Sequence, residues 1–248
     1  MTGGFGDVVA AELVKLRTLP GVVATLGGTV GTAVAVVAAT VATARSTGEG
    51  GPADVDAVAL ACRAVPFLQA GPIIIGVLGG AAEYAGGLLR TTLVACPDRR
   101  AVLAGRAAAY LVVSALTATA ALGAGLTTGW IAGAAVRPVG WAAVQVSVGA
   151  VGYLVLVGLL GHAVAVVLRG VLPGLAVTLG LVFVVCPVLA GFTGVAGVLP
   201  ERAGRLLAGA SDAAAVAVPD LVTGLIVLLG WIGVIGTVAA TVFLRRDV

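Results

Sequence analysis

The chain has 248 residues, of which 60% are hydrophobic and 10% are charged, and its mean hydropathy is +1.18. Soluble globular proteins carry about 25% charged residues, so this composition excludes an ordinary soluble domain. The formal net charge is +3. The placement of the basic residues, described below, accounts for that charge, and we expect no nucleic-acid partner.

Residues 5–19 precede the first long apolar stretch. Phe5, Val9, Leu13 and Leu16 recur at helical spacing, which favours a short amphipathic helix lying in the membrane interface. The alternative is a plain charged flank that only sets topology. Pro20 marks the end of the segment and the turn into the membrane.

Six stretches without charged residues follow, at 21–44, 64–82, 107–136, 138–168, 170–200 and 221–244. A helix needs about 20 apolar residues to cross a hydrocarbon core of about 30 Å. Helices satisfy their own backbone polar groups, and alternating ten-residue strands of the barrel type are missing from the sequence. We therefore predict an all-α integral membrane protein in which residues 1–248 form one transmembrane domain with six spans.

The second stretch contains Pro66 and Pro72 with Gln69 between them. Prolines remove backbone donors and permit kinks in a span. Gln69 is a candidate for the substrate path, although a polar side chain in a span more often bonds a neighbouring helix. The preceding residues 45–60 are rich in glycine and are expected to form a flexible connector.

The segment between the second and third stretches, residues 83–106, concentrates charge. Glu83, Gly87 and Arg90 share one helical face, Pro97 ends that helix, and a new helix is expected to start near Ala101. A hairpin that only places positive charge inside would explain the arginines. It would not explain the glutamate, which is costly near the bilayer edge unless it is paired or solvated.

Residues 199–219 precede the last span and mix charged with apolar positions. They are expected to form a short helix at the outer surface, or a re-entrant helix dipping into it. Pro219 then opens the last span.

Orientation follows from the basic residues. With the N-terminus in the cytoplasm, nine lie inside: Lys15, Arg17, Arg90, Arg99, Arg100, Arg106, Arg169, Arg245 and Arg246. Five lie outside: Arg45, Arg63, Arg137, Arg202 and Arg205. This bias agrees with the positive-inside tendency and places both termini in the cytoplasm.

Several kinds of chemistry have no residues to support them. Lys15 is the only lysine and is followed by Leu16, which excludes a phosphate-binding loop of the G-x-x-x-x-G-K-[ST] type. His162, the only histidine, has no acidic residue near it in the spans, so a structural hydrogen bond is favoured over catalysis or proton transfer. Cys62, Cys96 and Cys186 are scattered, and neither a disulfide nor a metal site is expected.

Three segments resemble one family. "EYAGGLLRTTLVACPDRR" resembles the first cytoplasmic loop of ABC-2 type transporter permeases, "AELVKLRTLP" resembles the N-terminal element of their bacterial branch, and "LRRDV" resembles their C-terminal ending. The matching positions are Glu83, Tyr84, Gly87, Arg90, Leu93, Pro97 and Arg99 in the loop, and Glu12, Lys15, Leu16 and Arg17 before the first span.

The resemblance implies a permease subunit of an exporter in a bacterial plasma membrane. It implies that the loop, including Arg100, and the N-terminal helix dock on two separate ABC ATPase subunits, which would bind ATP and Mg. It also implies a second permease chain, identical or not, and membrane lipid as surroundings. This chain would bind no cofactor and catalyse nothing itself, and the substrate would be an amphiphile, a lipid or an antibiotic-like compound.

Two alternatives from other classes stay open. A membrane-embedded enzyme that modifies lipids would need clustered acids, histidines or serines near one face. An ion-coupled transporter acting alone would need an ionisable residue in mid-membrane, and only His162 could serve.

Overall fold

The structure, a computed structural model, describes residues 5–47, 56–82, 84, 92, 94, 98–135, 140–192, 199–207 and 218–245. Within these ranges the regular structure is helical and no strand forms, which confirms the all-α prediction. Among the same residues, five helices are long and apolar enough to cross a membrane, and a bent pair of shorter helices would make a sixth crossing.

The elements follow one another as short and long helices. They are α1 (Phe5–Thr18), α2 (Pro20–Thr47), α3 (Ala57–Arg63), α4 (Val65–Leu68), α5 (Ala70–Ala81), α7 (Arg99–Ile131), α8 (Trp141–Leu168), α9 (Val171–Gly180), the π-helical turn η3 (Leu181–Val185), α10 (Cys186–Phe192), α11 (Pro200–Leu207) and α12 (Val218–Arg245).

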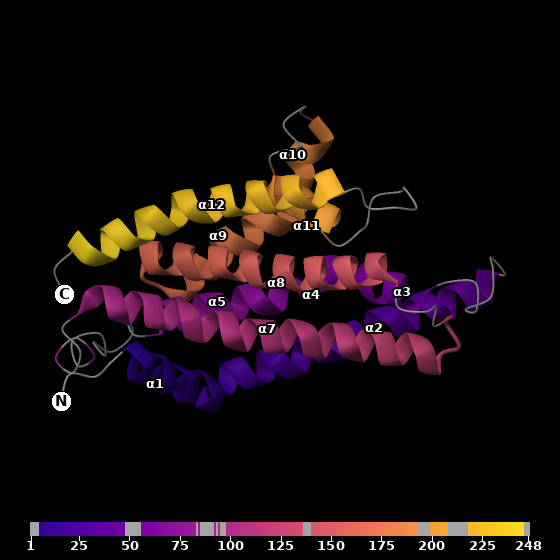
Figure 1. Ribbon diagram of the computed structural model, residues 1–248, viewed down its shortest axis with the longest axis horizontal. Helices are drawn as coiled ribbons and strands as arrows, with labels where there is room; N and C mark the ends of the chain where they lie inside the picture. The colour runs from indigo at the N-terminus through magenta and orange to yellow at the C-terminus, as the bar shows by residue number, and fades with distance from the viewer. Residues whose placement is uncertain are drawn as a thin grey trace.

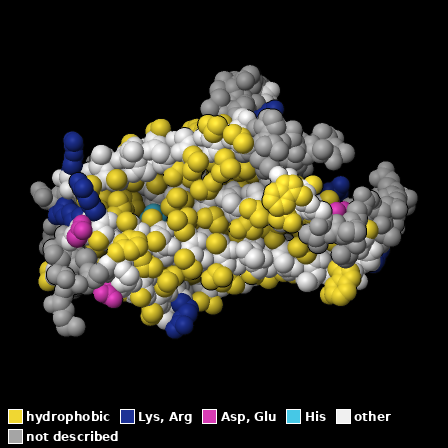
Figure 2. Space-filling model, viewed as in Figure 1, with side chains coloured by type: hydrophobic (Ala, Val, Ile, Leu, Met, Phe, Trp, Pro, Cys, Tyr) yellow, Lys and Arg dark blue, Asp and Glu magenta, His cyan; other side chains and the backbone are white. Residues whose placement is uncertain are grey.

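The long helices run side by side along the longest axis of the molecule (Figure 1). The first residues of α1 and α7 and the last turn of α12 lie at one end, at the left of the view. Figure 2 shows apolar side chains along the visible flank, while most of the visible charged side chains lie near the two ends. This distribution is the one expected of helices that cross a membrane.

Helix α1 occupies the predicted N-terminal segment, and its packed face includes Leu13 and Leu16 of the predicted apolar stripe. Glu12 and Leu16 are its buried residues, whereas Phe5, the first member of the predicted apolar stripe, is 51% exposed. Pro20 is the first residue of α2, where its missing N–H leaves no helical hydrogen bond unmade. The position of α1 in a membrane interface stays a prediction.

The second predicted span is broken. The unit Ala57–Leu68 and the unit Ala70–Ala81 meet at Gln69 with a bend of 43°. Pro66 and Pro72 each lie in the first turn of a helix, where a missing N–H costs little. The end of α2 and the start of α3 also occupy parts of the segment predicted as a flexible connector, so that prediction is wrong for residues 45–47 and 57–60.

Helix α7 begins earlier than predicted. Asp98 caps it by accepting hydrogen bonds from the backbone N–H groups of Arg100 and Ala101 at 2.9 and 3.3 Å, and the helix starts at Arg99. Residues 99–106 of the predicted coupling loop are therefore the first two turns of α7.

Glycines allow α5 and α8 to pack closely against each other. A side chain at Gly76 would collide with the carbonyl of Gly158, and one at Gly80 would lie 2.7 Å from the carbonyl of His162. Gly27 and Gly31 on α2 have the same spacing, yet a side chain at either would meet no atom within 4 Å. The same spacing of small residues therefore accompanies close packing on α5 and an open face on α2.

Candidate functional site

A charged junction joins α1, α7 and α12 at the end of the bundle where α1 begins. Its members are Glu12 and Lys15 of α1, Arg106 of α7 and Phe243 of α12. The Glu12 carboxylate lies 3.5 Å from Nε of Arg106 and 3.6 Å from Nζ of Lys15. The Arg106 guanidinium carbon lies 6.0 Å from the centre of the Phe243 ring. One arginine thus contacts both the first helix and the last.

Arg106 is 2% exposed and Glu12 is 7% exposed. A buried guanidinium is costly unless an opposite charge compensates it, so Glu12 is the group that allows Arg106 to lie inside. Lys15, which is partly exposed, completes the junction toward the surface. Burial lowers the pKa of Lys15, and the neighbouring Glu12 carboxylate opposes that shift.

Small and apolar neighbours hold α1 in this position. Gly105, directly before Arg106, leaves room for Val8, whose side chain would lie 2.6 Å from a Cβ at that position. Leu16, one turn after Glu12, packs in a cluster with Ile75 of α5 and Ala109 of α7. Close backbone approach and apolar contacts therefore bring the carboxylate to the arginine.

Two further contacts join segments at the same end. Arg99 Nη1 donates a hydrogen bond of 3.4 Å to the carbonyl of Leu244 in the last turn of α12. The Arg169 guanidinium lies 5.6 Å from the centre of the Tyr84 ring, which links the end of α5 to the turn between α8 and α9. Arg169 adopts a left-handed conformation with φ of 53°, and burial raises the pKa of Tyr84.

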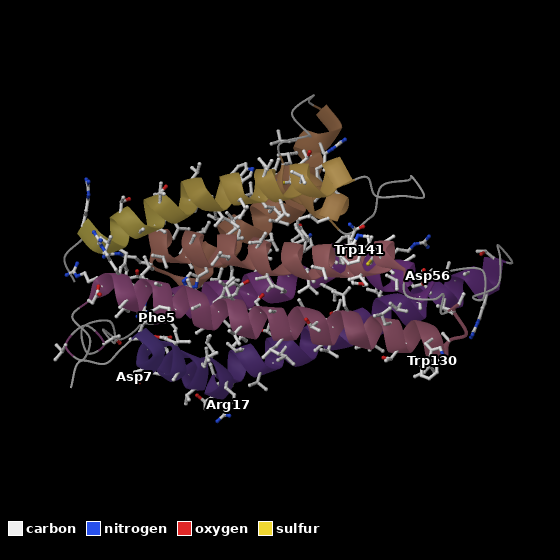
Figure 3. All side chains as sticks on the ribbon, viewed as in Figure 1. Phe5, Asp7, Arg17, Asp56, Trp130 and Trp141 are labelled. Atoms are coloured by element: carbon white, nitrogen blue, oxygen red, sulfur yellow. The ribbon has the colours of Figure 1, made fainter. Side chains whose placement is uncertain are left out.

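The residues predicted for coupling fall into three groups. Tyr84 and Arg99 make the contacts just described, and Arg100 is exposed in the first turn of α7. Arg17 is exposed and points away from the bundle (Figure 3). The remaining positions lie outside the described residues: Glu83, Gly87, Arg90 and Pro97.

Gln69 lies inside the bundle. It is 3% exposed, and its side-chain oxygen accepts a hydrogen bond of 2.5 Å from the Tyr153 hydroxyl of α8. A groove of about 200 Å³ does open beside it, between α2 and the break, and its lining includes Thr29, Leu68 and Ala70 but not Gln69. The amide therefore fixes the break against α8, and its neighbours face the groove.

His162 is also an internal packing residue. Its Nδ1 lies 3.2 Å from the carbonyl oxygen of Gly76, and its ring stacks on Tyr110 with 5.8 Å between ring centres. The Tyr110 hydroxyl oxygen lies 3.0 Å from the carbonyl oxygen of Val155 and 3.0 Å from Oγ of Ser114, and its single proton can be donated to one of them. Among the described residues, no group of three or more His, Cys, Asp or Glu side chains could hold a metal ion.

Comparison with known proteins finds no protein family and no curated protein that matches the chain.

Proposed function

We propose that this chain is the membrane subunit of an ATP-driven exporter of the ABC-2 type. It would carry an amphiphilic, lipid or antibiotic-like substrate outward, while two separate ATPase subunits bind and hydrolyse ATP with Mg. Six crossings, with the broken helix pair as the second, would place both termini in the cytoplasm of a bacterial cell. A second permease chain would complete the assembly.

The observation that carries the proposal is the junction of Glu12 with Arg106. The resemblance assigns docking on an ATPase to two segments that are distant in sequence, the N-terminal helix and the loop before α7. In the structure α1 is bound to the start of α7 through a buried ion pair. The same end of α7 contacts α12 through Arg99 and Arg106.

This geometry suggests how a soluble partner could act on the spans. A force applied to α1 or to the first turn of α7 would reach α12 through contacts of side chains, because Arg106 touches both helices. Buried charged contacts break at high cost, so the three helix ends are expected to move together. The permease would then need no catalytic group of its own.

The test is capture of a P-loop ATPase from native membranes with affinity-tagged full-length chain. Arg100 is exposed beside the junction, and we expect Arg100→Glu to weaken capture, since charged contacts lose affinity when one sign is inverted. The matched control is Arg202→Glu, which makes the same charge change at an exposed position of α11.

Topology must be checked in parallel, because Arg100→Glu also removes an inner positive charge. An impermeant maleimide should label Cys96 from the same side in both variants and in the unmodified chain. If that labelling is unchanged and both variants capture the ATPase as well as the unmodified chain does, the start of α7 is not the docking site.

A further inference from the structure

A second groove lies far from the junction, between α8, α11 and α12. It has a volume of about 360 Å³, within the range of about 300–1,000 Å³ that is common for ligand sites. Its walls are formed by Trp141, Val144, Val148 and Gly152 of α8, Leu207 of α11 and Leu225 of α12. Among the described residues, no charged side chain lines it, and Gln145 is its one polar side chain.

Two glycines of α8 shape the groove. A side chain at Gly149 would collide with the carbonyl of Leu207, so this glycine allows α11 to lie against α8. A side chain at Gly152 would meet no atom within 4 Å, so this glycine leaves the deep end of the groove open. The close contact at Gly149 and the open space at Gly152, one turn later, together produce a groove along α8.

The groove starts at the level of the aromatic side chains that mark this end of the bundle. Trp141 and Trp130 are 75% and 64% exposed and both lie toward the end of the molecule opposite α1 (Figure 3). Exposed tryptophans are enriched where a membrane protein meets the headgroup level. Val148 at 66% and Leu225 at 41% exposure then face outward along the groove, as membrane-facing residues do.

The length of the groove matches one leaflet. From Trp141 to Gly152 the helix rises about 16 Å at about 1.5 Å per residue. Half of a hydrocarbon core of about 30 Å is about 15 Å. The groove therefore extends from the aromatic level to the middle of the bilayer. A helix of about 10 Å diameter would be too wide an occupant for so small a volume.

From these observations we infer that the groove holds, as a resident ligand, one acyl chain of a phospholipid of the leaflet at the end of the bundle opposite α1. The acyl chain fills the space between α8, α11 and α12 and contacts all three helices. This inference does not depend on the exporter proposal, because it concerns a lipid that stays bound.

The experiment uses the full-length chain in liposomes of phosphatidylethanolamine and phosphatidylglycerol. A trace of phosphatidylcholine with a diazirine midway along one acyl chain serves as the probe, and mass spectrometry locates the crosslinks. We expect several-fold more crosslinking at Val148, Gly152 and Leu225 than at Val234 and Val238. Those two residues of α12 are 66% and 45% exposed and do not line the groove. Equal crosslinking at both sets would overturn the inference, because it would show only contact with bulk lipid.

A filling variant tests the groove itself. Gly152→Leu places a side chain in open space at the deep end, and we expect it to reduce crosslinking in the groove to the level at Val234. The matched control is Gly236→Leu on α12, where a side chain also meets no atom within 4 Å, and it should change nothing. If Gly152→Leu misfolds, Val148→Trp fills the groove from its exposed side. Full crosslinking in a folded filling variant would overturn the inference.

Discussion

The ion pair between Glu12 and Arg106 should hold α1 against the bundle. Replacing Glu12 by Leu leaves the guanidinium of Arg106 buried at 2% exposure without its carboxylate. Removing one partner of a buried pair costs about 3–5 kcal/mol, and we expect about 3 kcal/mol here because Lys15 brings partial exposure to the junction. Since α1 lies at the start of the chain, the cost should appear as detachment of α1 rather than as unfolding of the spans.

Local opening can be measured at Leu16. This residue is 3% exposed and packs against α5 and α7, so a cysteine there reacts with maleimide only when α1 detaches. A cost of about 3 kcal/mol raises the opening equilibrium about a hundredfold, since about 1.4 kcal/mol corresponds to a factor of ten. In a Leu16→Cys background in which Cys62, Cys96 and Cys186 are replaced by alanine, Glu12→Leu should therefore increase the labelling rate about a hundredfold, after division by the rate for the same chain unfolded.

Controls separate the pair from a general loss of charge. Asp7→Leu removes an exposed carboxylate from the same helix and should change the rate less than tenfold. The double variant Glu12→Leu with Arg106→Leu removes both charges, and the rate should return to within a few-fold of the starting value. Equal rates for Glu12→Leu and Asp7→Leu, or additive effects in the double variant, would refute the reasoning.

Three further predictions concern the interior and the chemistry. Gly158→Ala should lower the free energy of unfolding by about 1–3 kcal/mol, because its methyl group would collide with the carbonyl of Pro72 and the hydroxyl of Tyr110. The control is Gly230→Ala, whose methyl group lies in open space, and it should leave that free energy unchanged. Thermal unfolding measures both variants. Tyr153→Phe leaves the buried amide of Gln69 without its donor and should cost about 1–3 kcal/mol, and a cycle with Gln69→Leu should recover part of the loss. The chain purified free of other polypeptides should not hydrolyse ATP, because it lacks a phosphate-binding loop. Release of phosphate from ATP that stays with this chain through every purification step would contradict the prediction.

The periodicity and length of apolar stretches were sufficient to predict the helices. The stretches at 21–44 and 221–244 correspond to α2 and α12 within a few residues, since uncharged runs in a membrane protein have few other solutions. Helix α7 starts at Arg99, two residues before the predicted start near Ala101. The uncharged stretch at 107–136 alone would place that start eight residues too late, because the Asp98 cap and the pairing of Arg106 with Glu12 permit a helix to begin among charged residues.

The junction itself could not be predicted from the sequence. A glutamate on the first helix and an arginine 94 residues later show no relation until the fold brings α1 beside α7. The charge pattern places Arg106 at the inner boundary, where it would set topology, whereas the structure buries its side chain. One feature of the sequence does point to the junction. Glu12 lies beside Leu13 and Leu16 on the apolar face of its helix, which is an unusual position for a carboxylate exposed to water. The two flanking prolines make Gln69 a candidate site residue in the sequence. Its hydrogen bond to Tyr153, however, depends on the bend between α4 and α5, which the sequence does not specify.

The central claim, that this chain is a permease subunit driven by separate ATPases, is tested most directly by purifying the tagged full-length chain from native membranes in a mild detergent. We expect that a polypeptide with a phosphate-binding loop co-purifies in a ratio of one to one, and that the complex hydrolyses ATP. A preparation that contains this chain without any nucleotide-binding polypeptide, and that still moves an amphiphile across a reconstituted membrane, would contradict it.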